Sequence, residues 1–277
     1  MPKPALSLLG FLEKEQAFEY LQKYCLLDDS SPQALQQHFS DATSRLGSVI
    51  ENAGNPETLN IPAIHQQHVD IIRNGSFAKG LESRGRVEIQ LVEIAPLLAA
   101  QIHVELDRAE SFYQRCETAP DIENMLLRCL PFGNDTFPIG IAQPLSPSSW
   151  MVRTPSLNLR SLEGGLFGVN GDNYLGVKIG AANPLVQVLK FKGRAYLVNG
   201  FHRAFSFGRA GAKYMPCIMQ EVQSLDGIAL GIPLERLLLD NPPTLAHFLN
   251  DRAYPIQLRH YQKYMTVTYA EHLFFEE

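Results

Sequence analysis

The sequence lacks the marks of several protein classes. No apolar run approaches the length of a transmembrane span, and the N-terminal segment lacks the small-residue cleavage site of a signal peptide. The four cysteines form no CxxC pair, and the chain shows neither heptads nor internal repeats. These absences, with 45% hydrophobic and 19% charged residues among 277, predict a globular cytoplasmic protein with buried thiols and no membrane partner.

Acidic residues are missing from one long stretch. Between Asn173 and Gln220 the chain has no Asp or Glu, although its formal net charge is -5. The stretch holds seven basic residues: Lys178, Lys190, Lys192, Arg194, Arg203, Arg209 and Lys213. This basic island predicts local anion binding, and the acidic overall balance disfavours strong nonspecific binding to nucleic acid. The alternative interpretation is that these cations are the solvated edges of a β-sheet.

A turn inside the basic island carries the most specific signal. An apolar strand pattern runs into Asn199-Gly200, and a helical pattern starts at once and stops at Gly211. Unpaired N–H groups and the dipole of a helix N-terminus favour bound anions, and glycine permits close approach. The turn therefore predicts a phosphate site with Arg203 reachable from solvent; a purely structural turn is the alternative. Its residues are Asn199, Gly200, Phe201, His202 and Arg203.

Two segments around this turn resemble a known family. Tyr-Leu-Val-Asn-Gly-Phe-His-Arg-Ala-Phe (196–205) and Ala-Gly-Ala-Lys-Tyr-Met-Pro-Cys-Ile (210–218) resemble the ParB/sulfiredoxin superfamily. The resemblance covers about residues 183–222. It implies a small α+β domain with a mixed sheet that binds a nucleotide, ATP or CTP with Mg²⁺, and it implies that Gly200, His202 and Arg203 contact the phosphates.

The departures from that family narrow the function. Sulfiredoxins carry their catalytic cysteine immediately before the His-Arg pair, where this chain has Phe201, so we expect no sulfinic acid reduction. ParB partition proteins continue into a helix-turn-helix region. Here residues 221–277 hold eight acidic against four basic residues, without a recognition helix.

Three functions remain open after these departures. The first is a nucleotide-dependent hydrolase or phosphotransferase, in which positioning and charge neutralisation supply most of the catalysis. The second is a non-catalytic nucleotide-sensing or protein-interaction module. The third and weakest is a DNA-processing protein. The sequence leaves the oligomeric state open, a homo-oligomer included.

Hydrophobic patterning predicts an α+β fold in three regions: a helical N-terminal region (1–80), the ParB/sulfiredoxin-like domain (81–222) and a C-terminal extension packed on it (223–277). The predicted helices are 13–27, 32–52, 61–73, 96–113, 122–129, 233–239 and 244–249. The predicted strands are 86–95, 166–169, 174–179, 185–191, 195–199, 214–222 and 264–269.

Residues 131–164 are rich in Pro, Gly and Ser and predict a long loop or short strands, with a possible role as a lid over the anion site. Arg153 and Ser156 are candidate phosphate contacts there, and Trp150 is a candidate for stacking on a base or for packing.

Two further residues are candidates for catalysis. Glu93, at the end of the first predicted strand, is a candidate catalytic base or magnesium ligand, and His202 is a candidate general acid or base. His65 and His68 have metal-pair spacing but no obvious third ligand, so a surface helix is favoured and no metal site is predicted.

Overall fold

The computed structural model describes residues 2–82, 85–113, 120–131, 143–146, 149–154, 159–169, 172–181, 185–225, 228, 230–259 and 263–268. The chain forms two compact units. Unit 1 comprises Met1–Phe132 and Leu185–His260, and unit 2 comprises Gly133–Pro184 and Tyr261–Glu277. This division follows a different line from the three predicted regions, because the segments before residue 80 and after residue 223 contribute to the same unit as the predicted central domain.

A six-stranded mixed sheet organises unit 1, in the order β2-β3-β12-β10-β11-β4. Its strands are β2 (Thr58–Leu59), β3 (Val87–Glu93), β4 (Leu98–Ala99), β10 (Gln187–Phe191), β11 (Arg194–Asn199) and β12 (Tyr214–Glu221). The β10–β11 hairpin turns at Lys192 and Gly193, which both have positive φ, as the twist of a two-residue hairpin requires. β12 runs parallel to β10 and antiparallel to β3.

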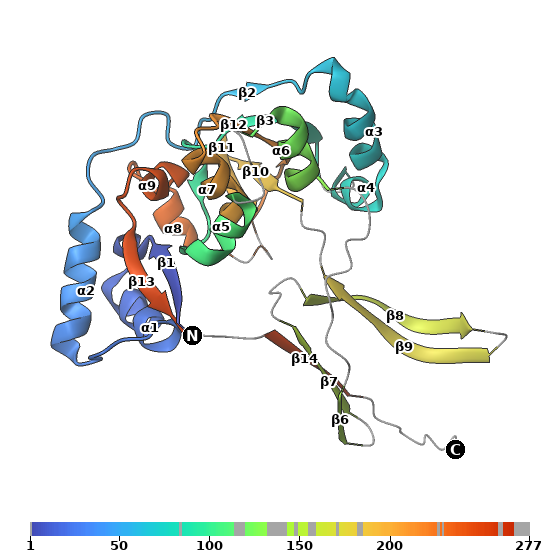
Figure 1. The fold of residues 1–277 in the computed structure, drawn as a ribbon, viewed down its shortest axis with the longest axis horizontal. Coiled ribbons are helices and arrows are strands. Elements are labelled where there is room, and N and C mark those ends of the chain that lie inside the picture. The colour runs from blue at the N-terminus through green and yellow to red at the C-terminus, as the bar shows by residue number, and fades with distance from the viewer. Residues whose placement is uncertain are drawn as a thin grey trace. The chain divides into compact units, whose positions relative to one another are not determined.

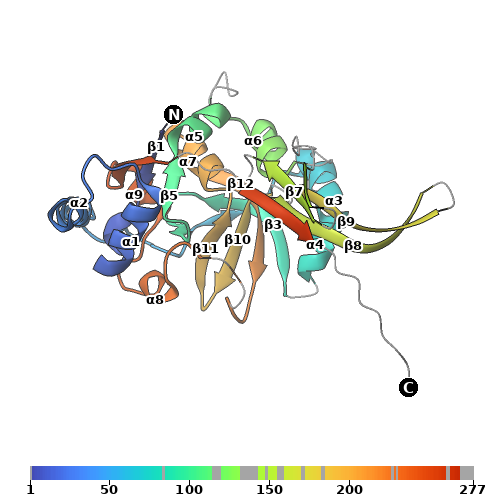
Figure 2. The same cartoon turned by 90° about the horizontal axis from the view of Figure 1, so that it is seen from below.

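Three helices cover one face of this sheet: α5 (Leu106–Tyr113), α6 (Ile122–Cys129) and α7 (Phe201–Arg209) (Figure 2). α7 connects β11 to β12, and the first seven residues of α7 are all buried. A helix that is buried around most of its circumference must be packed from several sides. Its neighbours include α5, β12 and the short helix α9 (Leu245–Leu249).

A smaller sheet, β13-β1-β5, adds the N-terminal segment to unit 1 (Figure 1). Its strands are β1 (Lys3–Ser7), β5 (His103–Glu105) and β13 (Tyr254–Leu258). The prediction of a helical N-terminal region is therefore incomplete, because its first element is the central strand of this sheet. The prediction of one helix over 96–113 is wrong in its first half, which holds β4 and β5. Both errors arise because the pairing partners are distant in sequence.

The remaining helices of unit 1 surround these two sheets (Figure 1). They are η1 (Leu9–Phe11), α1 (Lys14–Tyr24), α2 (Pro32–Ser44), η2 (Ala63–His65), α3 (Gln66–Asn74), α4 (Ser76–Glu82) and α8 (Leu234–Leu237). α2 begins as predicted, with the Ser31 hydroxyl accepting a hydrogen bond from the Ala34 N–H and Pro32 in the first turn. The α+β class is confirmed.

Unit 2 consists of antiparallel strands. β6 (Gln143–Ser146), β7 (Ser149–Thr154) and β14 (Lys263–Thr268) form one sheet, and β8 (Leu159–Val169) pairs with β9 (Asp172–Ala181). The predicted loop at 131–164 therefore holds two whole strands and the start of a third. β7 is paired by β14, more than 100 residues away, so local composition could not show it. In the part of the chain that the structure describes, no helix has the length and apolar character needed to cross a membrane.

Candidate functional site

Gly200 forms the turn between β11 and α7 in a conformation that other residues tolerate poorly. Its φ is 104°, in the left-handed region. A Cβ atom built on Gly200 would lie 2.7 Å from Cγ2 of Val186, which is a severe clash. Both the positive φ and the close approach of Val186 therefore require glycine at this position. The glycine that the sequence analysis assigned to ligand approach is packed against the protein itself.

The start of α7 presents backbone donors. The first hydrogen bond within the helix is donated by the Ala204 N–H to the Gly200 carbonyl, at 2.9 Å. The N–H groups of Phe201, His202 and Arg203 precede that bond, so they belong to the donors that a helix leaves unpaired at its N-terminus. The helix dipole adds partial positive charge at the same point.

His202 is buried and used as a hydrogen-bond acceptor. Its Nε2 accepts the backbone N–H of Glu105, at 3.1 Å, so this nitrogen carries no proton. Burial, helped by the positive charge of Arg108, lowers the pKa of His202 to about 3. The imidazole is therefore neutral at physiological pH, and its acceptor nitrogen already has a partner. This arrangement favours a positioning role over the general acid or base considered from the sequence.

Arg203 is buried, which corrects the expectation that solvent reaches it. Only 5% of the residue is exposed. Its Nη1 donates to the carbonyl oxygens of Arg128, at 2.9 Å, and Cys129, at 3.4 Å. These carbonyls lie in the last turn of α6, where helices leave acceptors unpaired. The sequence hid this role because the α6 residues lie about 75 positions before the turn.

Arg108 is a third basic residue at the turn, and the sequence analysis missed it. It lies on α5 and is partly exposed. Its charge lowers the pKa of both His202 and Arg203; burial is the larger cause in each case and brings the pKa of Arg203 to about 10. Arg108 lies outside the acid-free stretch, between Asp107 and Glu110. No local charge signal could have singled it out.

One acidic residue, Glu105, lies beside the turn: against the effect of burial its charge raises the pKa of His202, whose ring accepts the Glu105 N–H. Within the described ranges, neither Arg108 nor Arg203 makes an ion pair. The Glu105 carboxylate is buried and pairs with Lys3 at 3.0 Å. Two guanidinium groups near a helix N-terminus repel each other, and a bound anion would relieve that repulsion. The arrangement therefore suits a phosphate better than a cationic or neutral ligand.

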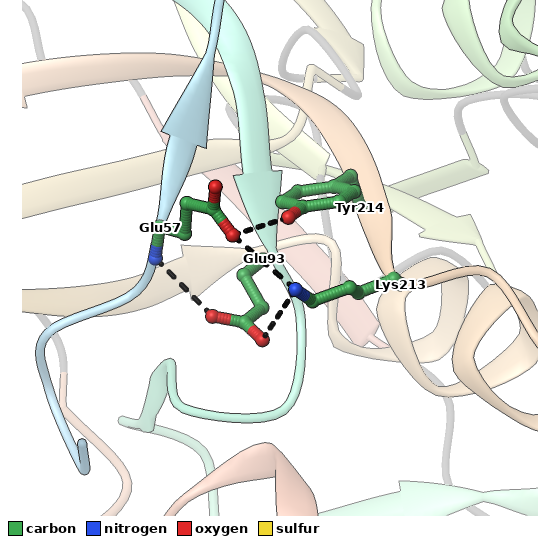
Figure 3. A network of polar contacts seen from close by, with 4 residues as sticks. All are labelled: Glu57, Glu93, Lys213 and Tyr214. Atoms are coloured by element: carbon green, nitrogen blue, oxygen red, sulfur yellow. Dashed lines mark hydrogen bonds and ion pairs between the residues drawn. The ribbon is translucent and has the colours of Figure 1, made fainter.

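Glu93 belongs to a different cluster (Figure 3). One of its carboxylate oxygens accepts the Glu57 N–H at 3.2 Å, and the other lies 3.6 Å from Lys213 Nζ. Lys213 also donates to Glu57 at 3.2 Å, and the Tyr214 hydroxyl donates to the same Glu57 oxygen. The Tyr214 bond, assisted by Lys213, lowers the pKa of Glu57. We call these four residues the Lys213 network.

The Lys213 network is separated from the turn along α7. β12 begins at Tyr214, four residues beyond Ala210 at the C-terminal end of the helix, whereas Gly200 precedes its N-terminal end. Glu93 therefore lies at the opposite end of α7 from the turn, and the structure does not bring it to His202 or Arg203. Its carboxylate ties β2 to the edge of the main sheet.

The remaining candidates belong to several elements of the two units or lie outside the described residues. Asn199 is the last residue of β11 and is partly exposed next to Gly200. Arg153 lies on β7 in unit 2, and Ser156 lies outside the described residues. Trp150 is 38% exposed on β7. His68 Nε2 bonds with the Leu130 carbonyl at 2.7 Å, a structural role. Among the described residues, no cluster of His, Cys, Asp or Glu could hold a metal ion.

Comparisons with protein-family models, with curated proteins and with solved structures found no match to this chain. The features of this chain that point to a function are the turn, its buried partners and the resemblance of the sequence around it.

Proposed function

We propose that this protein binds the phosphate groups of a nucleotide at the start of α7 and acts as a nucleotide-sensing module of the ParB/sulfiredoxin type. The observation that carries the proposal is the N-terminus of α7, where buried Arg203 follows the glycine turn: burial and the charge of Arg108 on α5 lower the pKa of Arg203, and neither arginine makes an ion pair among the described residues. Such a site costs stability when empty and gains it when an anion binds.

The residues at the turn have two roles: some contact the phosphates, and others hold the backbone in place. The backbone N–H groups of residues 201–203 and the partly exposed Arg108 are the groups that meet the phosphates. Arg203 and His202 hold the turn in shape from inside, through the α6 carbonyls and the Glu105 N–H. Gly200 and the packed Val186 fix the path of the backbone.

The resemblance implies ATP or CTP with Mg²⁺ as the ligand. The described residues offer no cluster of metal ligands, so Mg²⁺ would be held by phosphate oxygens and water, as is common for this ion. The sensing role is favoured over hydrolysis because Glu93, the candidate base, lies in the Lys213 network at the far end of α7.

A thermal-shift panel tests the proposal. Full-length protein is heated with ATP, ADP, CTP, GTP or sodium tripolyphosphate, each with Mg²⁺, and sodium sulfate at equal ionic strength serves as the control. A ligand that binds only the folded state at one hundred times its Kd stabilises it by about 2.7 kcal/mol, so we expect a clear rise in Tm with at least one nucleotide. Equal Tm values across the panel would refute the proposal.

Phosphate release separates the two classes of function. A sensing module binds the nucleotide that raises Tm without turning it over, whereas a hydrolase releases phosphate from the same nucleotide. Release above the uncatalysed background that is lost in Arg108→Gln would assign catalysis to the turn. We also propose that the protein is cytoplasmic, a proposal supported by the buried, reduced thiols of Cys25 and Cys217.

A further inference from the structure

Unit 2 is joined to unit 1 at three points of the chain. The chain passes into unit 2 after Phe132, returns at Leu185 and passes into unit 2 again after His260. We call Cys129–Pro131 the outgoing stem and Leu185–Val186 the returning stem. Both stems lie in unit 1, and both contact the Gly200 turn or the side chains that it carries.

The outgoing stem is held by Arg203. Its guanidinium donates to the carbonyls of Arg128 and Cys129, where α6 ends and the chain turns towards unit 2. His68 Nε2 bonds with the carbonyl of the next residue, Leu130, at 2.7 Å. The last two carbonyl groups of α6 and the first one beyond it therefore all have side-chain partners.

The returning stem is held by the Cys129 carbonyl and by the Gly200 turn. The Val186 N–H donates to Cys129 O at 2.8 Å, and the Val186 carbonyl accepts the Ile218 N–H at 2.9 Å. The side chain of Val186 fills the space where a Cβ of Gly200 would lie. The Cys129 carbonyl thus links Arg203 to Val186 and joins the two stems.

We propose that the Gly200 turn anchors the two stems and transmits the occupancy of the anion site to them; this rests on the proposed function. Arg203 donates to both carbonyls without a ligand, but burial and the charge of Arg108 lower its pKa, so its charged form is disfavoured while the site is empty. A bound phosphate relieves the repulsion from Arg108 and favours the position in which Arg203 holds the Arg128 and Cys129 carbonyls. Because Cys129 O also holds Val186, both stems become more strongly ordered when the site is filled.

The first experiment tests the anchor without any ligand. Hydrogen exchange is followed by mass spectrometry on full-length wild type and Arg203→Lys, a variant that keeps the charge but loses the planar fork. Loss of a charged hydrogen bond is expected to speed exchange about tenfold or more in the peptides 126–131 and 185–191. Unchanged exchange in both peptides would overturn the anchor. If Arg203→Lys does not fold, Val186→Ala is used instead. Unchanged exchange in the 185–191 peptide of that variant would overturn the anchor.

The third connection supplies a matched control. Arg259 Nε donates to Cys25 O at 2.9 Å, next to the point where the chain passes into unit 2 for the last time. Arg259→Ala removes an arginine–carbonyl contact of the same kind, but the contact lies far along the chain from the turn. We expect Arg259→Ala to leave exchange in 126–131 and 185–191 at the wild-type rate. Faster exchange there would mean that the stems respond to any loss of stability.

The second experiment tests the transmission. Sodium tripolyphosphate with Mg²⁺ is added to wild-type protein, and exchange is compared in the same two stem peptides. We expect exchange to slow severalfold in both. Binding seen by thermal shift with unchanged stem exchange would overturn the transmission and leave the proposed function intact. Absence of binding to every phosphate probe would refute the proposed function, and the transmission with it, whereas the ligand-free experiment would still decide the anchor.

Discussion

The two charged clusters at the ends of α7 show opposite ways of placing cations. At the N-terminal end, Arg203 is buried and donates hydrogen bonds to two backbone carbonyls, and the charge of Arg108 acts on it. At the C-terminal end, Lys213 is exposed and pairs with Glu57 and Glu93. Both cations come from the same acid-free stretch of sequence. Only the fold decides which of them remains without an acidic partner.

This difference shows that a count of charges along the sequence does not predict which cations are neutralised in the fold. The carboxylates that neutralise Lys213 come from residues 57 and 93, far outside the stretch. The cation that adds to the charge at Arg203 comes from residue 108, equally far away. If this account is correct, substitutions of the buried Gly200 and Arg203 will lower stability strongly at any salt concentration, whereas substitutions in the Lys213 network will lower it slightly and only at low salt.

The largest effect is expected from Arg203→Ala. The substitution leaves two α6 carbonyls without their donor and opens a cavity, so unfolding free energy should fall by about 3 kcal/mol. Urea unfolding followed by circular dichroism measures the loss. Arg209→Ala, at an exposed position on the same helix, is the control and should change stability by less than about 0.5 kcal/mol. Equal stabilities for the two variants would mean that Arg203 is not a structural residue.

Gly200→Ala should have the next largest effect. It should lower the free energy of unfolding by about 2–3 kcal/mol, because alanine is strained at this φ and its Cβ clashes with Val186. Gly211→Ala provides a matched comparison, because Gly211 also has positive φ, 87°, but has no atom within 4 Å of its Cβ position. Gly211→Ala should lower the free energy of unfolding by only about 1 kcal/mol. The difference between the two midpoints measures the packing of Val186 against the turn. A difference of zero would contradict the close approach.

Acid should destabilise the turn through His202. The pKa of His202 is about 3 in the folded state, below the ordinary value near 6.5 of an unfolded chain. Between those values the unfolded chain binds a proton that the folded protein does not, so stability falls as pH falls through this window. Lowering the pH from 7 to 5 should therefore reduce the free energy of unfolding by about 2 kcal/mol through His202 alone.

His202→Gln isolates that cost, because glutamine keeps an acceptor for the Glu105 N–H but does not titrate. Urea unfolding at pH 7, 6 and 5 should show a shallower loss of stability in the variant than in wild type. His103 and His247, whose pKa values burial lowers to about 4, retain their share of the acid sensitivity in both proteins. Identical pH profiles would mean that His202 is already protonated or exposed.

The smallest effect should come from Glu93→Gln in the Lys213 network. Partly exposed ion pairs contribute little and are screened by salt. We expect a shift in the urea midpoint below that of Gly211→Ala, and we expect the shift to disappear in 1 M NaCl. A loss comparable to that of Gly200→Ala would show that the network is as important to the fold as the turn.

The sequence predicted the fold best where each element is specified by nearby residues. The helix 122–129 and the strand pattern 195–199 match α6 and β11 closely, because capping and alternation are local signals. β1 and β5 were missed because their partners lie about 100 residues or more away. Composition left a long loop or short strands open around β7, and pairing with the distant strand β14 makes it a strand.

The candidate site divides in the same way. The turn itself was predicted from a glycine between a strand and a helix, and the structure places residues 199–203 there. The burial of Arg203 was not predicted, because its acceptors are carbonyl groups, which every residue carries and no sequence pattern marks. Arg108 was not predicted because its neighbours in sequence are acidic and its approach to the turn depends on the packing of α5 against α7.

The most direct test of the account is a single variant measured in two ways. Arg108→Gln removes the like charge beside Arg203, so the ligand-free protein should become more stable by about 0.5 kcal/mol. Calorimetric titration of the same variant, with the nucleotide that raises the wild-type Tm, should show affinity at least about tenfold weaker, because a phosphate contact is lost. Wild-type affinity, or a loss of stability in Arg108→Gln, would contradict an anion site at the start of α7.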